Sequence, residues 1–521
     1  MNESPFIRLI TSPALWASGL VLVIAGWLGT HFLGDTDQQY LLGLSWRMFR
    51  GEAIYTDFDY VRPPLSPWLH QVWFFLPASV ALVAGRMAMV IQLAISSWLL
   101  SRVLLPSSRQ YVWAFLLSFL VSLHNFPTMP WHTIDGVFFG AVGIWCLTRE
   151  SSWKYAGWWM ICLSAMTKQS FFPLIPAALL WQLLDSPGQW KSHLAGLLTG
   201  LGVGTLLVWW IAGPALEDGM IGMIMGSGSL EDVIQAGIFQ YVIPLVPAIV
   251  IISLKYAAGL YRYHSVEKWL YPLSLTLLLG SWVFLSLTKG ETVSPPFRVA
   301  HILFWVAFWE AIQRYRRSKD LTWMMALTLA WCASLSWGYQ TPILVAAPLV
   351  LITDPDRLQK LIVPVLAASA IVLAGVFYPY RESFPTVSLP EETQPAYPTL
   401  AGIQTGKEIT EELEELAEWS TRFSGSFTVL PNWPLIHCLT TTDNPIRIDW
   451  AHNAEGIFDQ WTLYEVGLEA CETIFVDKDR AEKADQDGRY GSVLLRHVMD
   501  NWDLKQEGTH FRIYQKVPKK Q

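Results

Sequence analysis

Four ionisable side chains in mostly apolar surroundings are the candidates for chemistry in this sequence. Asp37 begins a segment of helical periodicity, where a carboxylate can take a proton from a hydroxyl group or can cap the helix. Arg62 and Lys168 can bind an anion such as a phosphate; the alternative for each is a long side chain that reaches a polar surface. Asp135 is a second carboxylate, close to two histidines. These residue types predict phosphate binding and proton transfer, if the fold brings them to one place.

A metal site is an alternative interpretation of Asp135, because His124 and His132 lie close to it in the sequence. Their spacing matches no known ligand pattern, and a histidine beside Trp131 at a membrane interface is commonly just solvated. We therefore expect no metal at this position. The sequence requires no cofactor, and nothing in it indicates a divalent cation.

The apolar composition of the chain predicts that transmembrane helices position these residues. Of the 521 residues, 52% are hydrophobic, 14% aromatic and only 15% charged. A soluble domain carries about 25% charged residues, so a soluble enzyme and a disordered chain are excluded. At roughly 20 apolar residues per span, the runs between proline, glycine and charge clusters predict an α-helical polytopic membrane protein with about 13 transmembrane helices. The expected spans are residues 13–32, 83–105, 110–124, 133–148, 154–167, 170–184, 194–212, 237–256, 268–288, 299–313, 321–334, 338–353 and 359–378.

The lysines and arginines predict the orientation, because loops that stay in the cytoplasm hold the excess of these residues. With the N-terminus inside, fifteen fall in cytoplasmic segments and six in outward loops: Arg47, Arg50, Arg62, Lys168, Lys289 and Arg298. An odd number of spans then places the C-terminus outside the cytoplasmic (inner) membrane. Residues 13–32 are expected to stay as an uncleaved anchor, since no small-residue cleavage site precedes Asp35.

The chain divides into two domains by charge. Residues 1–381 hold 23 Lys and Arg against 19 Asp and Glu, whereas residues 382–521 hold 13 against 24. We expect residues 1–381 to form the transmembrane domain, with a first outward loop at 33–70, and residues 382–521 to form a soluble extracytoplasmic domain. An acidic domain of this kind argues against nucleic acid as a partner.

The pattern of the C-terminal domain alternates between helix and strand from about residue 396, which predicts a small α/β fold. Strands are expected at 426–430, 473–476 and 510–515. Cys438 and Cys471 both fall in this domain, and an oxidising compartment would allow a disulfide between them; two free thiols are the alternative.

The first outward loop is the most patterned polar segment of the chain. Apolar residues at helical spacing, from Leu41 to Phe49, predict an amphipathic helix at the membrane surface. Gly51 ends this helix. A tyrosine-rich acidic turn follows, and Pro63-Pro64 fixes an extended segment before the next apolar run.

This loop resembles that of the GT-C superfamily of polyprenyl-phosphate-sugar-dependent glycosyltransferases, in its protein O-mannosyltransferase-like and lipid A aminoarabinose transferase-like branch. Members have one span and then an outward loop that opens with Asp-Glu. A helix ending in glycine, a Tyr-x-Asp-Phe-like turn and Lys-Pro-Pro-Leu follow. The matching residues are Asp37, Tyr40, Gly51, Tyr55, Asp57, Phe58, Arg62, Pro63, Pro64 and Leu65. The span count and the outward C-terminal domain also match.

Two positions depart from the pattern of the family. This chain has Asp37-Gln38 in place of Asp-Glu, so one carboxylate is missing, and Asp35 is the possible substitute. Arg62 stands where the family often has lysine; its planar guanidinium keeps the charge and suits a phosphate. Which acid is catalytic stays open at this point.

The resemblance implies a glycosyltransferase that moves a sugar from a polyprenyl (undecaprenyl or dolichyl) phosphate to a glycan, lipid or protein acceptor. It implies Asp37 as base, Asp135 as a second active-site acid, and Arg62 and Lys168 as phosphate ligands. If the acceptor is itself a phosphate, Asp37 would orient or bind it instead. Further substrate-binding candidates are Tyr40, Asp35 and Arg298.

Two other functions are open from sequence. One is a transporter or flippase of lipid-linked sugar, and the other is a non-catalytic role in cell-envelope assembly if Gln38 marks a lost active site. Transporters tend to have internal repeats and charges near the bilayer centre, and neither is evident here. We expect a monomer that contacts membrane lipids and the lipid-linked donor.

Overall fold

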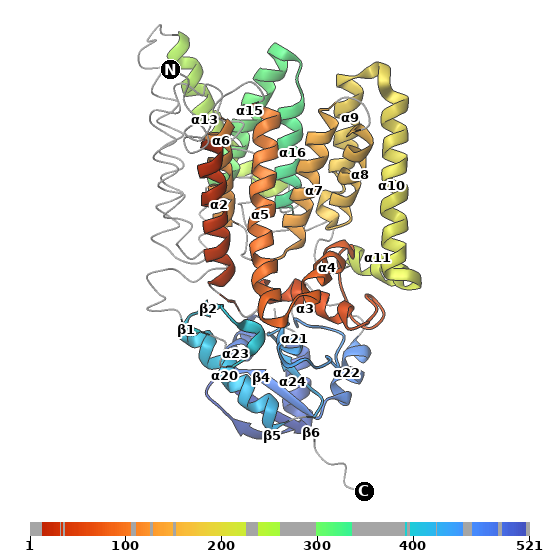
Figure 1. Cartoon of the computed structure of the whole chain (residues 1–521), viewed down its shortest axis with the longest axis vertical. Coiled ribbons are helices and arrows are strands. Elements are labelled where there is room, and N and C mark those ends of the chain that lie inside the picture. The colour runs from red at the N-terminus through yellow and green to blue at the C-terminus, as the bar shows by residue number, and fades with distance from the viewer. Residues whose placement is uncertain are drawn as a thin grey trace, which may run out of the picture.

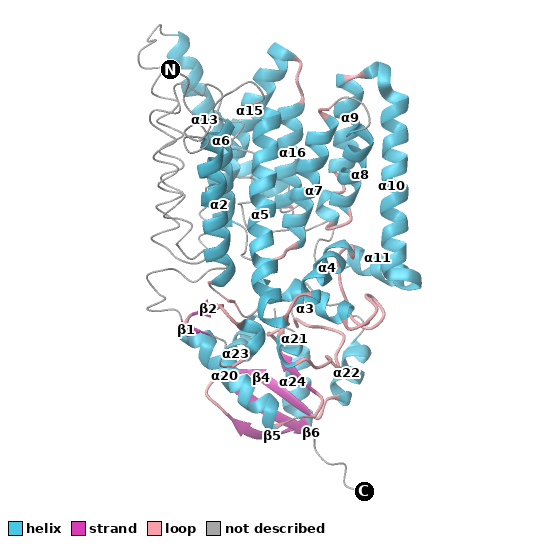
Figure 2. Cartoon of the chain, in the orientation of Figure 1, coloured by secondary structure: helices cyan, strands magenta, loops and turns pink. Residues whose placement is uncertain are grey.

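The computed structural model describes residues 13–31, 33–34, 37–105, 111–125, 129–149, 153–225, 238–260, 299–335, 391–392, 396–423, 425–451, 461–487 and 492–516. Within these residues, a bundle of long helices occupies one end of the molecule and a small α/β domain the other (Figure 1). Figure 2 shows that the strands lie in the smaller domain. The expected separation into a helical part and an α/β part is therefore present.

Ten of the thirteen expected spans coincide with helices of the bundle. The spans expected at 268–288, 338–353 and 359–378 lie outside the described residues, so the count of thirteen stays a prediction. The helices are α2 (Pro13–Thr30), α5 (Ala78–Leu104), α6 (Tyr111–Asn125), α7 (His132–Leu147), α8 (Trp153–Ala165), α9 (Leu174–Asp185), α10 (Trp190–Ala212), α13 (Gln240–Leu260), α15 (Val299–Ser318) and α16 (Thr322–Ser334).

The outer faces of the bundle expose large apolar side chains, as a protein surrounded by lipid does. Val23 of α2 is 70% exposed, Leu206 of α10 is 67% exposed and Val246 of α13 is 65% exposed. In the described part of the chain, two helical segments are long and apolar enough to cross a membrane, Ala78–Leu104 and Pro187–Met220. These exposed faces place the bundle in a membrane.

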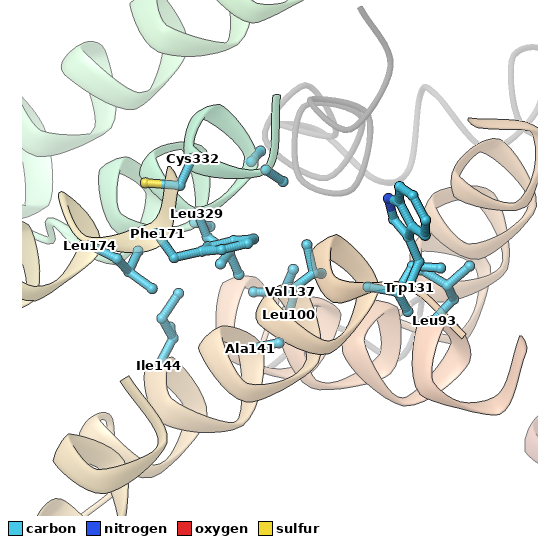
Figure 3. Close-up of a cluster of buried hydrophobic side chains, with 14 of the residues drawn as sticks. Leu93, Leu100, Trp131, Val137, Ala141, Ile144, Phe171, Leu174, Leu329 and Cys332 are labelled. Carbon is cyan, nitrogen blue, oxygen red and sulfur yellow. The ribbon is translucent and has the colours of Figure 1, made fainter. Parts of the chain in front are cut away.

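Helix α7 packs in the core of the bundle against α5, α8 and α16. Two of its glycines allow close approach, because a Cβ atom at Gly136 would overlap the Phe171 ring and one at Gly140 would overlap Leu329. Figure 3 shows Phe171 and Leu329 in the cluster that surrounds this helix. The position of the start of α7, which carries Asp135, is therefore fixed by packing.

A layer of short elements lies between the bundle and the α/β domain (Figure 1). Its members are α3 (Asp37–Phe49), α4 (Leu65–His70), the 3-10 helix η1 (Gln71–Phe75) and α11 (Leu216–Met225). The predicted helix is confirmed as α3, but its polar residues Gln39, Ser45 and Arg47 are buried, so the described part of α3 has no exposed polar face of the kind expected for an amphipathic helix at a membrane surface. Gly51 follows its end with a φ of +95°, a conformation that glycine adopts without steric cost.

The α/β domain is built on a four-stranded sheet in the order β3-β4-β6-β5. β3 pairs in parallel with β4, and the other two pairs are antiparallel. Its strands are β3 (Phe427–Leu430), β4 (Thr473–Asp477), β5 (Trp502–Glu507) and β6 (Phe511–Lys516), and β1 (Glu391–Glu392) with β2 (Gln404–Thr405) forms a separate pair. Its helices are α20 (Lys407–Arg422), α21 (Ile436–Thr440), α22 (Trp461–Ala470), α23 (Lys478–Asp487) and α24 (Ser492–Asn501).

The three predicted strands are confirmed as β3, β4 and β6, and β5 was not predicted. β5 lies at the edge of the sheet, and four of its six residues are exposed, three of them charged. Edge strands commonly carry such residues, which hide the hydrophobic alternation that identifies a strand. Sequence periodicity therefore could not find it.

The disulfide considered for Cys438 and Cys471 is not formed, because both residues are free and buried. Cys438 belongs to the hydrophobic cluster of Phe427 and Trp433, whereas Cys471 belongs to the cluster of Ile474 and Leu494. Burial raises the pKa of the Cys438 thiol, and it raises that of Cys471 to about 12. Both side chains act as small core residues in this domain.

Candidate functional site

The motif of the first outward loop forms a tight turn after α3. Tyr55 has a φ of +69°, which is rare for a residue with a side chain, and its backbone N–H donates to the Phe58 carbonyl at 2.9 Å. Asp57 closes the turn by accepting a 2.7 Å hydrogen bond from the Ala53 backbone N–H. The Tyr55 hydroxyl then donates to the backbone carbonyl of Arg62 at 2.6 Å. The turn therefore fixes the backbone that carries Arg62.

Arg62 and Lys168 lie on two segments joined by hydrogen bonds. The Leu65 backbone N–H donates to the Met166 carbonyl at 3.3 Å, and the Gln169 side-chain amide donates to the Val61 carbonyl at 3.2 Å. These bonds flank the two cations, which are distant in the chain. Arg62 is 7% exposed and Lys168 is 4% exposed. The structure thus brings together the two residues predicted to bind phosphate.

The start of α7 completes this cluster. Lys168 Nζ donates to Thr133 Oγ1 at 3.4 Å, and the charges of both Arg62 and Lys168 act on the neighbouring imidazole of His132. His132 and Thr133 are buried. Two buried cations, a hydroxyl and an imidazole form an electropositive cluster that suits an oxyanion.

Several buried polar atoms of these same segments make no hydrogen bond within the described part of the chain. They are His132 Nδ1, Ser66 Oγ, which is four residues after Arg62, and Ser170 Oγ, which is two residues after Lys168. Buried polar groups are normally satisfied. Additional donors and acceptors beside two cations fit the several oxygen atoms of a phosphate.

Asp135 lies on the first turn of α7 and is fully buried. His70 Nε2 lies 3.0 Å from its Oδ2, and the Gln92 side-chain amide donates to its Oδ1 at 3.1 Å. Trp73 donates its indole N–H to His70 Nδ1 at 2.9 Å, so Nδ1 is an acceptor and the neutral ring carries its proton on Nε2, facing Asp135. Two donors therefore hold the carboxylate, and the helix N-terminus further stabilises its charge.

An aromatic cluster connects α3 to this region. The Tyr40 ring is buried, with its centroid 6.5 Å from those of Tyr60 and Trp131 and 5.6 Å from that of Trp450 in the α/β domain. Tyr60 precedes Arg62 by two residues, and Trp131 precedes His132. Tyr40, expected to bind substrate, thus packs between the cation cluster and the α/β domain.

The remaining predicted residues lie at the limits of the described chain. Asp37 is the first residue of α3, one turn before Tyr40; its side chain is not among those described. Asp35 and Arg298 lie outside the described residues. The choice between Asp37 and Asp35 as base therefore stays a prediction.

The metal alternative for Asp135 rested on His124 and His132. The partner of the carboxylate is His70 rather than His132, and the side chain of His124 is outside the described set. Among the residues that the structure describes, no group of three or more His, Cys, Asp or Glu side chains could hold a metal ion.

Sequence reasoning missed His70, Gln92 and Thr133 as members of the site. Gln92 had a usable signal, because an amide inside the 27-residue apolar helix α5 requires a partner. His70 is the last residue of the first outward loop and of α4. Nothing in the sequence indicates that it meets Asp135, since that contact depends on how α4 packs against α7.

No family model and no curated protein matches this chain. Among solved structures, it is similar to the crystal structure of ArnT from Cupriavidus metallidurans bound to undecaprenyl phosphate, with a TM-score of 0.48 and 11% identity over 97% of this chain and 98% of that one. It is also similar to the oligosaccharyltransferase AglB from Archaeoglobus fulgidus in complex with an inhibitory peptide and a dolichol-phosphate. That comparison has a TM-score of 0.44 and 13% identity over 89% of this chain and 69% of that one.

Proposed function

We propose that this chain is a membrane glycosyltransferase of the GT-C type, which transfers a sugar from a polyprenyl phosphate to an acceptor outside the cytoplasm. The observation that carries the proposal is the pairing of Arg62 with Lys168 on two segments joined by hydrogen bonds. Both cations are less than a tenth exposed, and Lys168 bonds to Thr133 Oγ1 at the start of α7. Two cations and a hydroxyl group in one buried cluster suit the oxygen atoms of a phosphate, such as that of a lipid-linked sugar.

In the proposed reaction, the bond between the sugar anomeric carbon and the phosphate oxygen breaks, and the acceptor oxygen forms the new bond to that carbon. Arg62 and Lys168 stabilise the negative charge that develops on the leaving polyprenyl phosphate. Asp37 takes the proton of the acceptor hydroxyl. Asp135, held by His70 and Gln92, is the second acid of the site.

The positions of the loops support the proposed orientation. The α/β domain contacts the first outward loop directly, since Arg47 of α3 forms an ion pair with Asp449 at 3.2 Å. Segments expected in the cytoplasm, such as the junction of α15 and α16 with Arg316 and Arg317, lie at the opposite end of the bundle (Figure 1). The site and the α/β domain would then both face outward from the cytoplasmic membrane.

The test uses purified full-length protein in detergent with a panel of radiolabelled undecaprenyl- and dolichyl-phosphate sugars. We expect the wild type to release the polyprenyl phosphate from one of them. Asp37→Asn and Arg62→Ala should each lower release by about a hundredfold or more, the range of a lost general base or charge-stabilising group.

Arg50→Ala is the matched control, because Arg50 is an exposed arginine of the same loop. It should leave release unchanged. Failure of the wild type on every donor would contradict the proposal, and movement of labelled lipid across vesicles without cleavage would favour a flippase.

A further inference from the structure

Two ion pairs join the α/β domain to the first outward loop, and the loop supplies the cation of one and the anion of the other. Arg47 of the loop pairs with Asp449 at 3.2 Å, and Asp59 of the loop pairs with Arg447 at 2.8 Å. Asn444 shapes the segment that presents both partners, since its side-chain amide donates to the Ile448 carbonyl and to Asp449 Oδ1. This segment therefore offers one cation and one anion in a fixed arrangement.

Asp59 takes nearly all of its partners from the α/β domain. Its Oδ1 accepts two hydrogen bonds from Arg447, at 2.8 and 3.2 Å, and its Oδ2 accepts one from the Tyr464 hydroxyl at 2.6 Å. Its backbone N–H donates to the Arg447 carbonyl at 2.8 Å. The carboxylate is 1% exposed. A buried charge with this partner set holds its own loop in one place, because leaving it unpaired is strongly unfavourable.

A continuous path of hydrogen bonds leads from Arg447 to Arg62. Arg447 Nη2 donates to the Tyr55 backbone carbonyl at 2.9 Å, while the Tyr55 hydroxyl donates to the Arg62 carbonyl at 2.6 Å. Burial raises the pKa of Tyr55, so its hydroxyl stays protonated and remains a donor. The left-handed conformation of Tyr55 is unfavourable for a residue with a side chain and persists only where surrounding contacts enforce it.

We propose that Arg447 of the α/β domain is a positioning residue for Arg62, which it acts upon through Tyr55 and Asp59. The inference rests on the proposed function, in which Arg62 binds the phosphate of the donor. It assigns the α/β domain a part in donor binding: the segment from Asn444 to Trp450 holds the turn that sets the backbone of Arg62. Tyr464 supports the same role through Asp59.

The chain contains a matched control for simple docking of the two domains. Arg50 of the loop pairs with Asp443 of the α/β domain at 3.3 Å, but the two side chains are 43% and 69% exposed. This pair joins the same two parts, and the Arg50 guanidinium donates to Asp443 rather than to the turn that contains Tyr55. Because an exposed ion pair contributes little to docking, Arg50→Ala controls for a general change at this interface, and the Arg62→Ala background separates positioning from docking.

The first experiment measures binding of undecaprenyl phosphate to the full-length protein in detergent. Arg447→Lys keeps the charge and the fold but cannot donate to Asp59 and Tyr55 together. We expect it to raise the Kd by about tenfold, whereas Arg50→Ala should change it by less than about twofold. In an Arg62→Ala background, Arg447→Lys should change the Kd by less than about twofold, because a residue that acts through Arg62 has no separate effect. Equal effects in both backgrounds would overturn the inference.

The second experiment is independent of any ligand. Hydrogen exchange of the peptide covering residues 53–65 should accelerate in Arg447→Lys and stay unchanged in Arg50→Ala. Unchanged exchange in Arg447→Lys would overturn the inference whatever the protein binds. If the wild type binds neither undecaprenyl phosphate nor dolichyl phosphate, the proposed function fails, while the exchange result still decides whether Arg447 holds this turn.

Discussion

At the scale of single residues, the carboxylate of Asp135 is the most constrained group of the candidate site. It is fully buried and accepts hydrogen bonds from the side chains of His70 and Gln92. Both of its oxygens are occupied by donors from two different elements, α4 and α5. A change of one atom in this side chain therefore alters the balance of donors and acceptors without changing its size.

We expect Asp135→Asn to lower transfer by at least about a hundredfold, the lower part of the range for a lost acid or base. The amide offers one acceptor where two donors converge, so its NH₂ group meets another donor. Transfer assays beside gel filtration in detergent would show a folded but inactive protein. Asp218→Asn, at an exposed acid of α11, is the control. Full activity of Asp135→Asn would contradict the assignment of Asp135 to the active site.

At the scale of elements, the short helix α21, which packs against α3, carries a buried histidine. His437 is 3% exposed, and its ring stacks on Phe427 with centroids 5.1 Å apart. Burial, with a smaller effect from the Arg47 charge, lowers the pKa of His437 to about 3. The histidine is therefore neutral in the folded domain at neutral pH.

This depressed pKa predicts acid sensitivity of the α/β domain. The unfolded chain binds a proton near pH 6.5 and the folded one only near pH 3, so the stability from this group is present above pH 6.5 and is lost as the pH falls toward 3. Between pH 7 and pH 5 we expect a loss of about 2 kcal/mol. Thermal unfolding of the full chain at both pH values would measure it.

His437→Gln provides the comparison, because glutamine does not titrate. Its unfolding temperature should depend less on pH than that of the wild type over this range. An equal pH dependence of the two proteins would show that other groups cause the effect.

Elements also show why part of the fold was predictable. The apolar runs of α5 and α7 and the buried strands β3 and β4 have the periodicity of their structure, so the sequence located them. The polar strand β5 and the charged helix α23 were missed, because neither has an apolar pattern. Neighbouring elements of the sheet, rather than local preference, define β5.

At the scale of the whole molecule, the proposed orientation in the membrane predicts which cysteine substitutions a membrane-impermeant reagent can label. All five cysteines are free and buried, so the wild type should react little with a membrane-impermeant maleimide. We expect Lys407→Cys, in the α/β domain, to be labelled on intact spheroplasts, and Arg317→Cys, exposed at the opposite end of the bundle, to be labelled only after permeabilisation. The reverse pattern would contradict the proposed orientation.

The sequence alone predicted which residues of the first outward loop belong to the candidate site, and it indicated a helical membrane protein with an acidic α/β domain. Composition and apolar periodicity are local properties, and they record which side chains face lipid or a core. The types of Arg62, Lys168 and Asp135 likewise limited the chemistry to anion binding and acid–base catalysis.

Only the tertiary structure decided which of these residues meet. The bonds of Leu65 to Met166 and of Gln169 to Val61 bring Arg62 to Lys168, and the packing of α4 against α7 brings His70 to Asp135. The ion pair of Asp59 with Arg447 joins residues from the two ends of the chain. Such contacts arise from the burial of surfaces that are far apart in sequence, and no local pattern encodes which partner a buried charge will find.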